Sequence, residues 1–213
     1  MKKEKNYWSI NSRKLDDIVV KARQFKPSGS DAARLEFYKG TYPVIVAWCS
    51  QKSTAWRRQD WLVLLCMTYS WMPRIPTQSF GSDYHEHSDK QWSEIKNDCR
   101  SCLNSHTAVS FLERHFPSGK PPFAGSWIGT SKMLHFINPD VFPIWDSKIA
   151  KAGCVNSGEN KLRHYKTYVE QMHNHLKNQN LKTTLQATKD KLLLNDLGDL
   201  RALEFCIFVA GKR

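Results

Sequence analysis

One segment of the sequence, Gly125–Lys151, combines residue types that could bind a phosphate and act on a sugar. Gly129, Thr130 and Ser131 stand at the predicted start of a helix, where free N–H groups and the positive end of the helix dipole can bind an anion. Asp146 follows a run of apolar residues at the start of the next predicted helix. A carboxylate beside C1′ of a sugar can stabilise the positive charge formed when a glycosidic bond breaks, and can activate water.

This segment resembles the helix-hairpin-helix superfamily of DNA glycosylases. The family pattern is a Gly-x-Gly hairpin, a helix, then Pro-x-x-Asp with a hydrophobic residue three positions on and a basic residue five positions on. Gly129 matches the second hairpin glycine, and the later part of the pattern falls on Pro143–Asp146, Ile149 and Lys151. The sequence departs from the pattern in two ways: Trp127 replaces the first glycine, and the stretch between helix and aspartate is shorter.

The resemblance implies an all-α fold over residues 1–213 as one domain, with two closely packed helical lobes and the active-site cleft between them. It implies a monomer that acts on double-stranded DNA, modified or viral, without cofactor or metal. Phage DNA containing glucosylated hydroxymethylcytosine is one such substrate. Asp146 would stabilise the oxocarbenium ion and activate water, leaving an abasic site. The residues implied to contact DNA are Gly129, Thr130, Ser131, Lys148 and Lys151.

Lys132 leaves a second mechanism open. Family members that also cut the strand have a Schiff-base lysine two residues after the second hairpin glycine, where this chain has Ser131. Lys132 is one residue further on, and one residue turns a helix by about 100°. The spacing therefore favours a monofunctional enzyme, with a bifunctional oxidised-base glycosylase and lyase that uses Lys132 as the alternative.

A base that is flipped out of the duplex needs a pocket with aromatic faces. The residues predicted to line such a pocket are Trp127, Trp145, His135, Tyr69 and Trp56. Each also has a purely structural interpretation, since aromatic side chains pack in cores more often than they bind ligands. Asp146 likewise suits an ordinary N-cap.

The elements that must position these residues are all predicted to be helical. After a short N-terminal helix, the pattern predicts a helix over 32–38, a break at Gly40–Pro43, and a segment over 44–50 that could be helix or strand, with helix favoured. A long helix from Ser53 or Thr54 to Trp71 follows. Further helices are predicted over 92–103, 107–115, 130–137, 146–153, 160–178 and 190–209.

Composition narrows the classes of partner. The chain has 213 residues with 32 Lys+Arg against 20 Asp+Glu, a formal net charge of +12. Such an excess favours a polyanionic partner, with nucleic acid first. The longest apolar run starts at Trp61 and is too short to span a bilayer. The basic start of the chain has no apolar stretch after it, so we expect a cytoplasmic protein.

Two other functions stay open at this level. The chain could be a helix-hairpin-helix protein that holds DNA without chemistry. It could also be an interaction domain stabilised by zinc on Cys99, Cys102 and His106, which have suitable ligand types. A second Cys-x-x-Cys is missing, so two helical thiols beside a polar histidine are the favoured interpretation.

Overall fold

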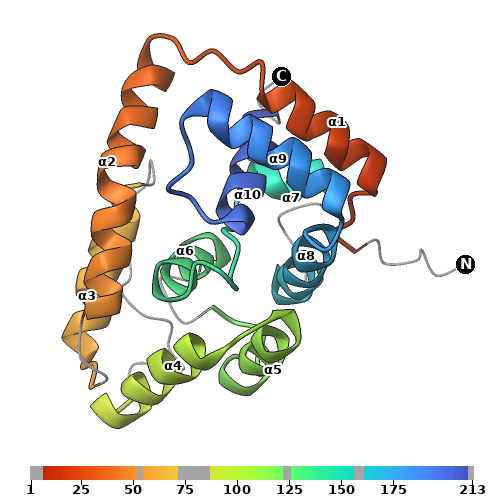
Figure 1. The fold of residues 1–213 in the computed structure, drawn as a ribbon. Helices are drawn as coiled ribbons and strands as arrows, with labels where there is room; N and C mark the ends of the chain where they lie inside the picture. Colours follow the sequence, from red (N-terminus) through yellow and green to blue (C-terminus); the bar gives the residue numbers. More distant parts are fainter. Residues whose placement is uncertain (1–6, 52–54, 72–86, 122–125, 156–160, 211–213) are drawn as a thin grey trace, which may run out of the picture.

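The computed structural model describes residues 7–51, 55–71, 87–121, 126–155 and 161–210 (Figure 1). Ten helices and no strand occur within these ranges, in agreement with the predicted all-α class. The helices are α1 Ser12–Ala22, α2 Ser30–Gln51, α3 Arg58–Tyr69, α4 Asp89–Ser101, α5 Ser105–His115, α6 Trp127–Ile137, α7 Ser147–Ala152, α8 Lys161–His175, α9 Gln179–Leu192 and α10 Asp199–Ala210.

Short polar side chains fix where several helices begin. Asn11, Ser88, Asn104 and Asn178 each accept a hydrogen bond from a backbone N–H in the first turn of the helix that follows. These groups satisfy amide hydrogens that have no partner inside the helix. The sequence therefore determines these starting points locally, before any tertiary contact forms.

Helix α6 lies inside the ring of helices in Figure 1 and packs against α2, α3 and α4. It is apolar on nearly all sides, with Met133, Leu134 and Phe136 completely buried. Helix α10 packs against α1, α7 and α9, while α5 packs against α8. A helix without a polar face needs neighbours all round, so α6 takes the central place.

Helix α2 is continuous through Gly40–Pro43, so the predicted break there is wrong. Tyr38, Tyr42, Ile45 and Cys49 recur at helical spacing and pack against the core. A proline inside a helix costs one hydrogen bond and introduces a steric clash. Burial of this continuous face against α6 and its neighbours outweighs that local cost.

The C-terminal half contains a helix, α9, that lies mostly between the helices predicted over 160–178 and 190–209, and α10 covers only the second half of the latter range. Helix α9 ends at Leu192, and its C-cap residue Leu193 has a left-handed backbone with φ of 55°. The chain then turns before α10 begins at Asp199. The turn brings α10 back beside α9, an arrangement that apolar periodicity alone does not reveal.

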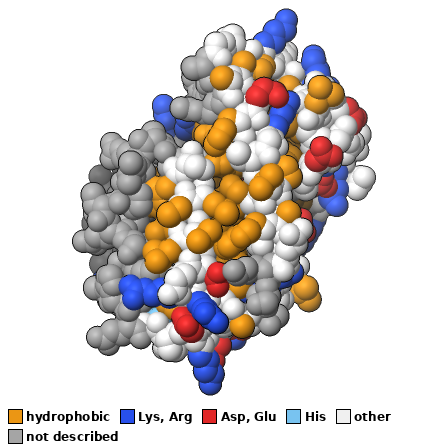
Figure 2. Space-filling model, turned by 90° about the vertical axis from the view of Figure 1, so that its left-hand side faces the viewer, with side chains coloured by type: hydrophobic (Ala, Val, Ile, Leu, Met, Phe, Trp, Pro, Cys, Tyr) orange, Lys and Arg blue, Asp and Glu red, His pale blue; other side chains and the backbone are white. Residues whose placement is uncertain are grey.

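Helices α2 and α3 form one outer face of the molecule. Figure 2 shows hydrophobic side chains gathered on this face. Phe37, Val44 and Val63 are 45 %, 64 % and 42 % exposed, respectively. None of the helices in the described ranges is long and apolar enough to cross a membrane.

Candidate functional site

Lys132 on α6 is a largely enclosed amine beside the end of α3. Its Nζ atom donates a hydrogen bond of 3.3 Å to the carbonyl oxygen of Trp71. Burial lowers the pKa of Lys132 to about 8, with the Asp146 carboxylate opposing that shift and the Arg201 guanidinium adding to it. A neutral amine is a nucleophile and a proton acceptor, and this lowered pKa makes a minor fraction of the Lys132 amine neutral at pH 7.

Asp146 caps α7. Its Oδ1 atom accepts hydrogen bonds of 2.8 Å from the amides of both Lys148 and Ile149. The N-cap interpretation of this residue is therefore confirmed. Within the described part of the chain no side chain or amide hydrogen-bonds Oδ2. A carboxylate fixed through one oxygen leaves the other for a ligand, so capping and chemistry are compatible.

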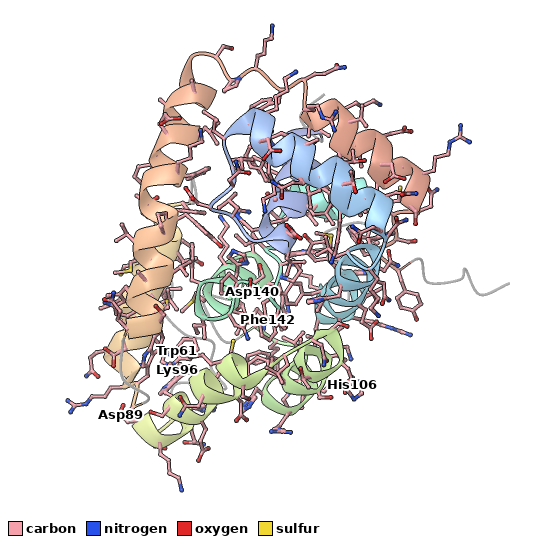
Figure 3. The ribbon with its side chains drawn as sticks, viewed as in Figure 1. Trp61, Asp89, Lys96, His106, Asp140 and Phe142 are labelled. Atoms are coloured by element: carbon pink, nitrogen blue, oxygen red, sulfur yellow. The ribbon has the colours of Figure 1, made fainter. Side chains whose placement is uncertain are left out.

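The connection from α6 to α7 is held from α6 by two side chains. His135 Nδ1 lies 2.7 Å from the carbonyl oxygen of Phe142, a residue labelled beside Asp140 in Figure 3. Ser131 Oγ accepts a bond of 2.9 Å from the amide of Trp145 and lies 3.3 Å from its carbonyl oxygen. Because Asp146 follows directly, these bonds position its carboxylate relative to α6.

Two residues from later helices hold the same connection. The Tyr165 hydroxyl donates to the carbonyl of Pro143 at 3.0 Å, and Glu204 Oε2 accepts from the amide of Ile144 at 3.0 Å. Both side chains are buried. A loop whose backbone groups are bonded to α6, α8 and α10 has little conformational freedom, which favours a fixed position for Asp146.

His135 is neutral in this environment. Burial lowers its pKa to about 3, and the nearby Arg201 acts in the same direction. Since a carbonyl can only accept, Nδ1 carries the proton and donates to Phe142. The other nitrogen, Nε2, lies 2.9 Å from the hydroxyl of Tyr42 and accepts a hydrogen bond from it. Both ring nitrogens of His135, which was predicted to contact the base, are thus hydrogen-bonded to other residues of the protein.

Arg201 and Glu204 form a buried ion pair one turn apart on α10. Burial raises the pKa of Glu204 to about 6, against the lowering effect of Arg201. The guanidinium carbon of Arg201 lies 5.6 Å from the ring centre of Tyr42 and 5.9 Å from that of Trp71. We refer to Tyr42, Lys132, His135, Asp146, Arg201 and Glu204 together as the polar cluster.

The sequence analysis missed three members of this cluster. Arg201 and Glu204 stand in a helix that is otherwise apolar, and charged residues are almost never fully buried without a partner. Two charged residues in an apolar helix were therefore the sequence signal that could have identified Arg201 and Glu204. Tyr42 gave no such signal, because it lies within the wrongly predicted break at Gly40–Pro43.

Three of the predicted pocket aromatics lie in the core instead. Trp127 is 2 % exposed and donates its indole N–H to the carbonyl of Gly119 at 3.0 Å. Trp145 is 2 % exposed and Trp56 is 0 % exposed. Indoles enclosed in this way have no free face for a base, so their predicted role is corrected. Tyr69 is half-buried on α3 and packs at the edge of the core.

The predicted phosphate site at the start of α6 also needs correction. The amides of Gly129 and Thr130 already donate to Ser126, at 3.3 Å and 2.9 Å. Thr130 and Ser131 are completely buried. Amides that are bonded and enclosed cannot contact a phosphate. Gly125, the first residue of the segment, lies outside the described residues.

The two predicted DNA-contacting lysines lie on α7. Lys151 is exposed in the last turn. Lys148 has its ammonium nitrogen 4.3 Å from the ring centre of Phe208. Both can add positive charge to the surface after Asp146, and their contact with DNA stays a prediction.

The residues of the zinc alternative point to separate partners. Cys99 Sγ lies 3.8 Å from the carbonyl of Leu134, and Cys102 Sγ lies 3.3 Å from that of Asp98. Burial raises the pKa of Cys102 to about 11, which disfavours a thiolate. His106 is exposed on α5 (Figure 3). Across the described ranges, no three His, Cys, Asp or Glu side chains are arranged to hold a metal ion.

Comparisons of the chain with protein-family models, with curated proteins and with solved structures each found no match. The candidate site is therefore defined by the residues of this chain alone. Three predicted site residues come together in the polar cluster: Lys132, His135 and Asp146. The other nine predicted site residues do not join them: Trp56, Tyr69, Trp127, Gly129, Thr130, Ser131, Trp145, Lys148 and Lys151.

Proposed function

We propose that this protein is a DNA glycosylase, which hydrolyses the N-glycosidic bond of a modified base in double-stranded DNA. The proposal rests on one observation above the others: Asp146 is fixed by two amides of α7 and acts electrostatically on the enclosed amine of Lys132. The net charge of +12 supports an anionic polymer as substrate. The resemblance of residues 125–151 to the helix-hairpin-helix glycosylases supports the same reaction class.

The reaction needs little from the protein beyond a placed carboxylate. The bond between C1′ and the base nitrogen breaks, and its electron pair leaves with the base. Positive charge then develops on the deoxyribose, which Asp146 stabilises. Water adds to C1′ and gives its proton to the carboxylate or to solvent, the released base takes up a proton from solvent, and an abasic site is left.

The substrate class we favour is DNA with a bulky modified base, such as glucosylated hydroxymethylcytosine in phage DNA. Flipping a base out of the stack costs a few kcal/mol. In the polar cluster, Lys132 has N–H groups beyond its bond to Trp71 that can donate to such a base. The polar segment Gln78–Lys90 has side chains that suit the hydroxyls of a glucosyl group, and it lies mostly outside the described residues.

The experiment is a base-release assay. The protein is incubated with unmodified DNA, oxidised or alkylated DNA and glucosylated phage DNA, and released bases are identified by mass spectrometry. We expect release from one modified substrate and a loss of at least about 100-fold in Asp146→Asn. Asparagine is as good an N-cap as aspartate, so this variant should keep the wild-type melting temperature.

A matched control is Asp140→Asn, an exposed carboxylate in the same connection, which should keep full activity. Full activity of Asp146→Asn would remove the role given to Asp146. DNA binding that weakens with salt, with no base released from any substrate, would favour the non-catalytic DNA-binding alternative.

The lowered pKa of Lys132 favours a second candidate, an additional lyase step. The amine would add to the C1′ aldehyde of the abasic site, and water would leave to give an imine. Loss of the C2′ proton would then expel the 3′ phosphate and cut the strand. Reduction with cyanoborohydride should trap a covalent protein–DNA complex, which Lys132→Gln should lose and Lys177→Gln should keep. Base release without any trapped complex would exclude the lyase step and favour a monofunctional glycosylase.

A further inference from the structure

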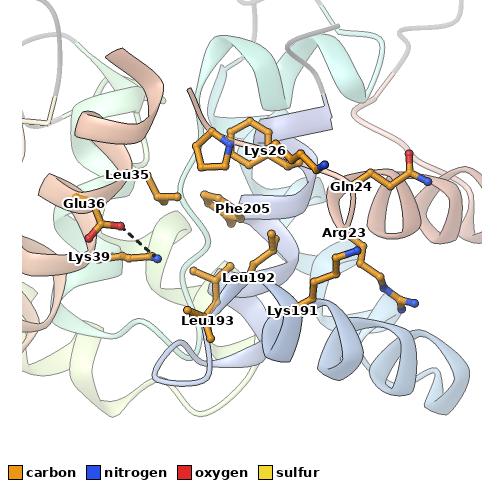
Figure 4. Close-up of a pocket in the computed structure, with 13 residues that line it drawn as sticks. Arg23, Gln24, Lys26, Leu35, Glu36, Lys39, Lys191, Leu192, Leu193 and Phe205 are labelled. Atoms are coloured by element: carbon orange, nitrogen blue, oxygen red, sulfur yellow. Dashed lines mark ion pairs between the residues drawn. The ribbon is translucent and has the colours of Figure 1, made fainter. Parts of the chain in front are cut away.

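A pocket of about 360 Å³ lies between the end of α1, the first half of α2, the end of α9 and α10 (Figure 4). We call it the α2–α10 pocket. Its volume is within the range of small-molecule sites, about 300–1,000 Å³. No residue of the polar cluster lines it. It therefore needs a ligand chemistry of its own.

The floor of the pocket is apolar. Phe205 of α10 lies at its centre, with Leu35 of α2 on one side and Leu192 of α9 on the other (Figure 4). Leu193 at the rim is 76 % exposed and has a left-handed backbone, φ 55°. That conformation costs a non-glycine residue roughly 1 kcal/mol or more. Its effect here is to keep an apolar side chain at the entrance.

The rim is positively charged. Of the four basic residues that line the pocket, Arg23 is bonded to α9 through Thr184 and Thr188, and Lys39 pairs with Glu36 at 3.5 Å. Glu36 is the single acidic residue in the lining. Within the described ranges, Lys26 and Lys191 have no ion-pair partner, and both are exposed. Two uncompensated ammonium groups therefore face solvent above an apolar floor.

We propose that the α2–α10 pocket binds a small amphipathic anion, with an apolar body on Phe205 and a carboxylate or phosphate between Lys26 and Lys191. An uncharged apolar ligand would leave the two cations unused. A bare phosphate would leave the apolar floor without a partner. The proposal does not depend on the glycosylase activity.

The pocket is nevertheless one helical turn from the polar cluster. Lys39 and Tyr42 are three residues apart on α2, and Phe205 and Arg201 are four residues apart on α10. A ligand that fills the space between α2 and α10 therefore contacts both helices that position Tyr42 and Arg201. Its binding can still be measured without any reference to base release.

The test is calorimetric titration of the full chain at low salt with four eight-carbon probes: octanoate, octyl phosphate, octanol and octylammonium. We expect both anions to bind at least about 10-fold more tightly than octanol. Octylammonium should bind more weakly than octanol. A preference between the two anions would distinguish a carboxylate ligand from a phosphate ligand.

Variants locate the binding. The double change Lys26→Glu and Lys191→Glu should reduce the affinity for the anions below that for octanol, and should leave octanol binding unchanged. Leu35→Trp fills the pocket and should weaken the binding of octanoate, octyl phosphate and octanol alike. Lys182→Glu, an exposed lysine elsewhere on α9, is the matched control and should change nothing.

Three outcomes would overturn the proposal. Equal affinities for octanol and the anions would mean that the lysines have no role. Equal losses in Lys182→Glu and Lys191→Glu would show a general effect of net charge. Displacement of octyl phosphate by a short DNA duplex, dependent on Lys26 and Lys191, would assign these lysines to a nucleic-acid surface instead.

Discussion

The polar cluster and the α2–α10 pocket are one helical turn apart, on the same two helices, yet they use charge in opposite ways. In the cluster, Arg201 and Glu204 are enclosed and paired, and burial shifts the pKa of Glu204 and Lys132 strongly. At the pocket, Lys26 and Lys191 are exposed. Enclosed charges change protonation and fix geometry, whereas exposed charges act only through a screened Coulomb field. The two regions should therefore respond differently to mutation, pH and salt.

The largest difference should come from breaking the buried pair. Glu204→Ala leaves the Arg201 charge uncompensated and the amide of Ile144 without its acceptor. We expect it to lower the free energy of unfolding by about 3–5 kcal/mol. Urea unfolding at pH 7 measures this, with Glu113→Ala as control, since the ion pair of Glu113 with Lys166 is on the surface. Glu113→Ala should lower the free energy of unfolding by at most about 1 kcal/mol. Similar losses in the two variants would show that the buried ion pair contributes no more than the surface pair.

Acid should act on the cluster through His135. Its folded pKa of about 3 lies below the ordinary 6.5, so the unfolded state takes up a proton first. Stability from the neutral imidazole is present above pH 6.5 and is lost as the pH falls toward 3. At pH 5 the loss should be about 2 kcal/mol, partly masked by Glu204, whose raised pKa acts in the opposite direction between about pH 4.5 and 6.

A comparison with His135→Gln, which is neutral at every pH, isolates this contribution. The difference in unfolding free energy between wild type and variant should narrow as the pH falls from 7 to 5. A constant difference over that range would show that His135 takes up a proton in the folded state.

A smaller effect in the same direction, but at higher pH, is expected for Lys132. Its folded pKa of about 8 lies below the ordinary 10.5, so the folded state releases its proton first and stability rises between about pH 8 and 9.5. Lys132→Met should be more stable than wild type at pH 7 by about 1–2 kcal/mol, and the gap should shrink by pH 9.5. Thermal unfolding at both pH values tests this. A stability difference between variant and wild type that grows with pH would contradict the burial of the Lys132 amine.

The smallest effect is expected at the pocket. The double change Lys26→Glu and Lys191→Glu should alter the free energy of unfolding by no more than about 0.5 kcal/mol, because neither lysine has a buried partner. Urea unfolding at pH 7 measures this. A loss above about 2 kcal/mol would place these lysines in the structural framework of the fold.

Part of this architecture could be predicted because its causes are local. The all-α class, the position of Asp146 at the start of α7 and the inclusion of Lys132 and His135 in α6 follow from capping residues and apolar spacing. Tryptophan gave the weakest guide to function. Trp127 and Trp145 were predicted to line a pocket, but the type of a residue does not specify which of its faces is free.

The sequence by itself determined the helical class, most helix starts and the carboxylate at the start of α7, because these depend on neighbours a few residues away. Only the tertiary structure decided the rest. It made α2 continuous through Pro43, and it brought Tyr42 to His135 and Glu204 to Ile144, pairs that are 93 and 60 residues apart in the chain. Those contacts form because enclosed polar groups must find partners wherever the packed helices provide them, and no local pattern records that requirement.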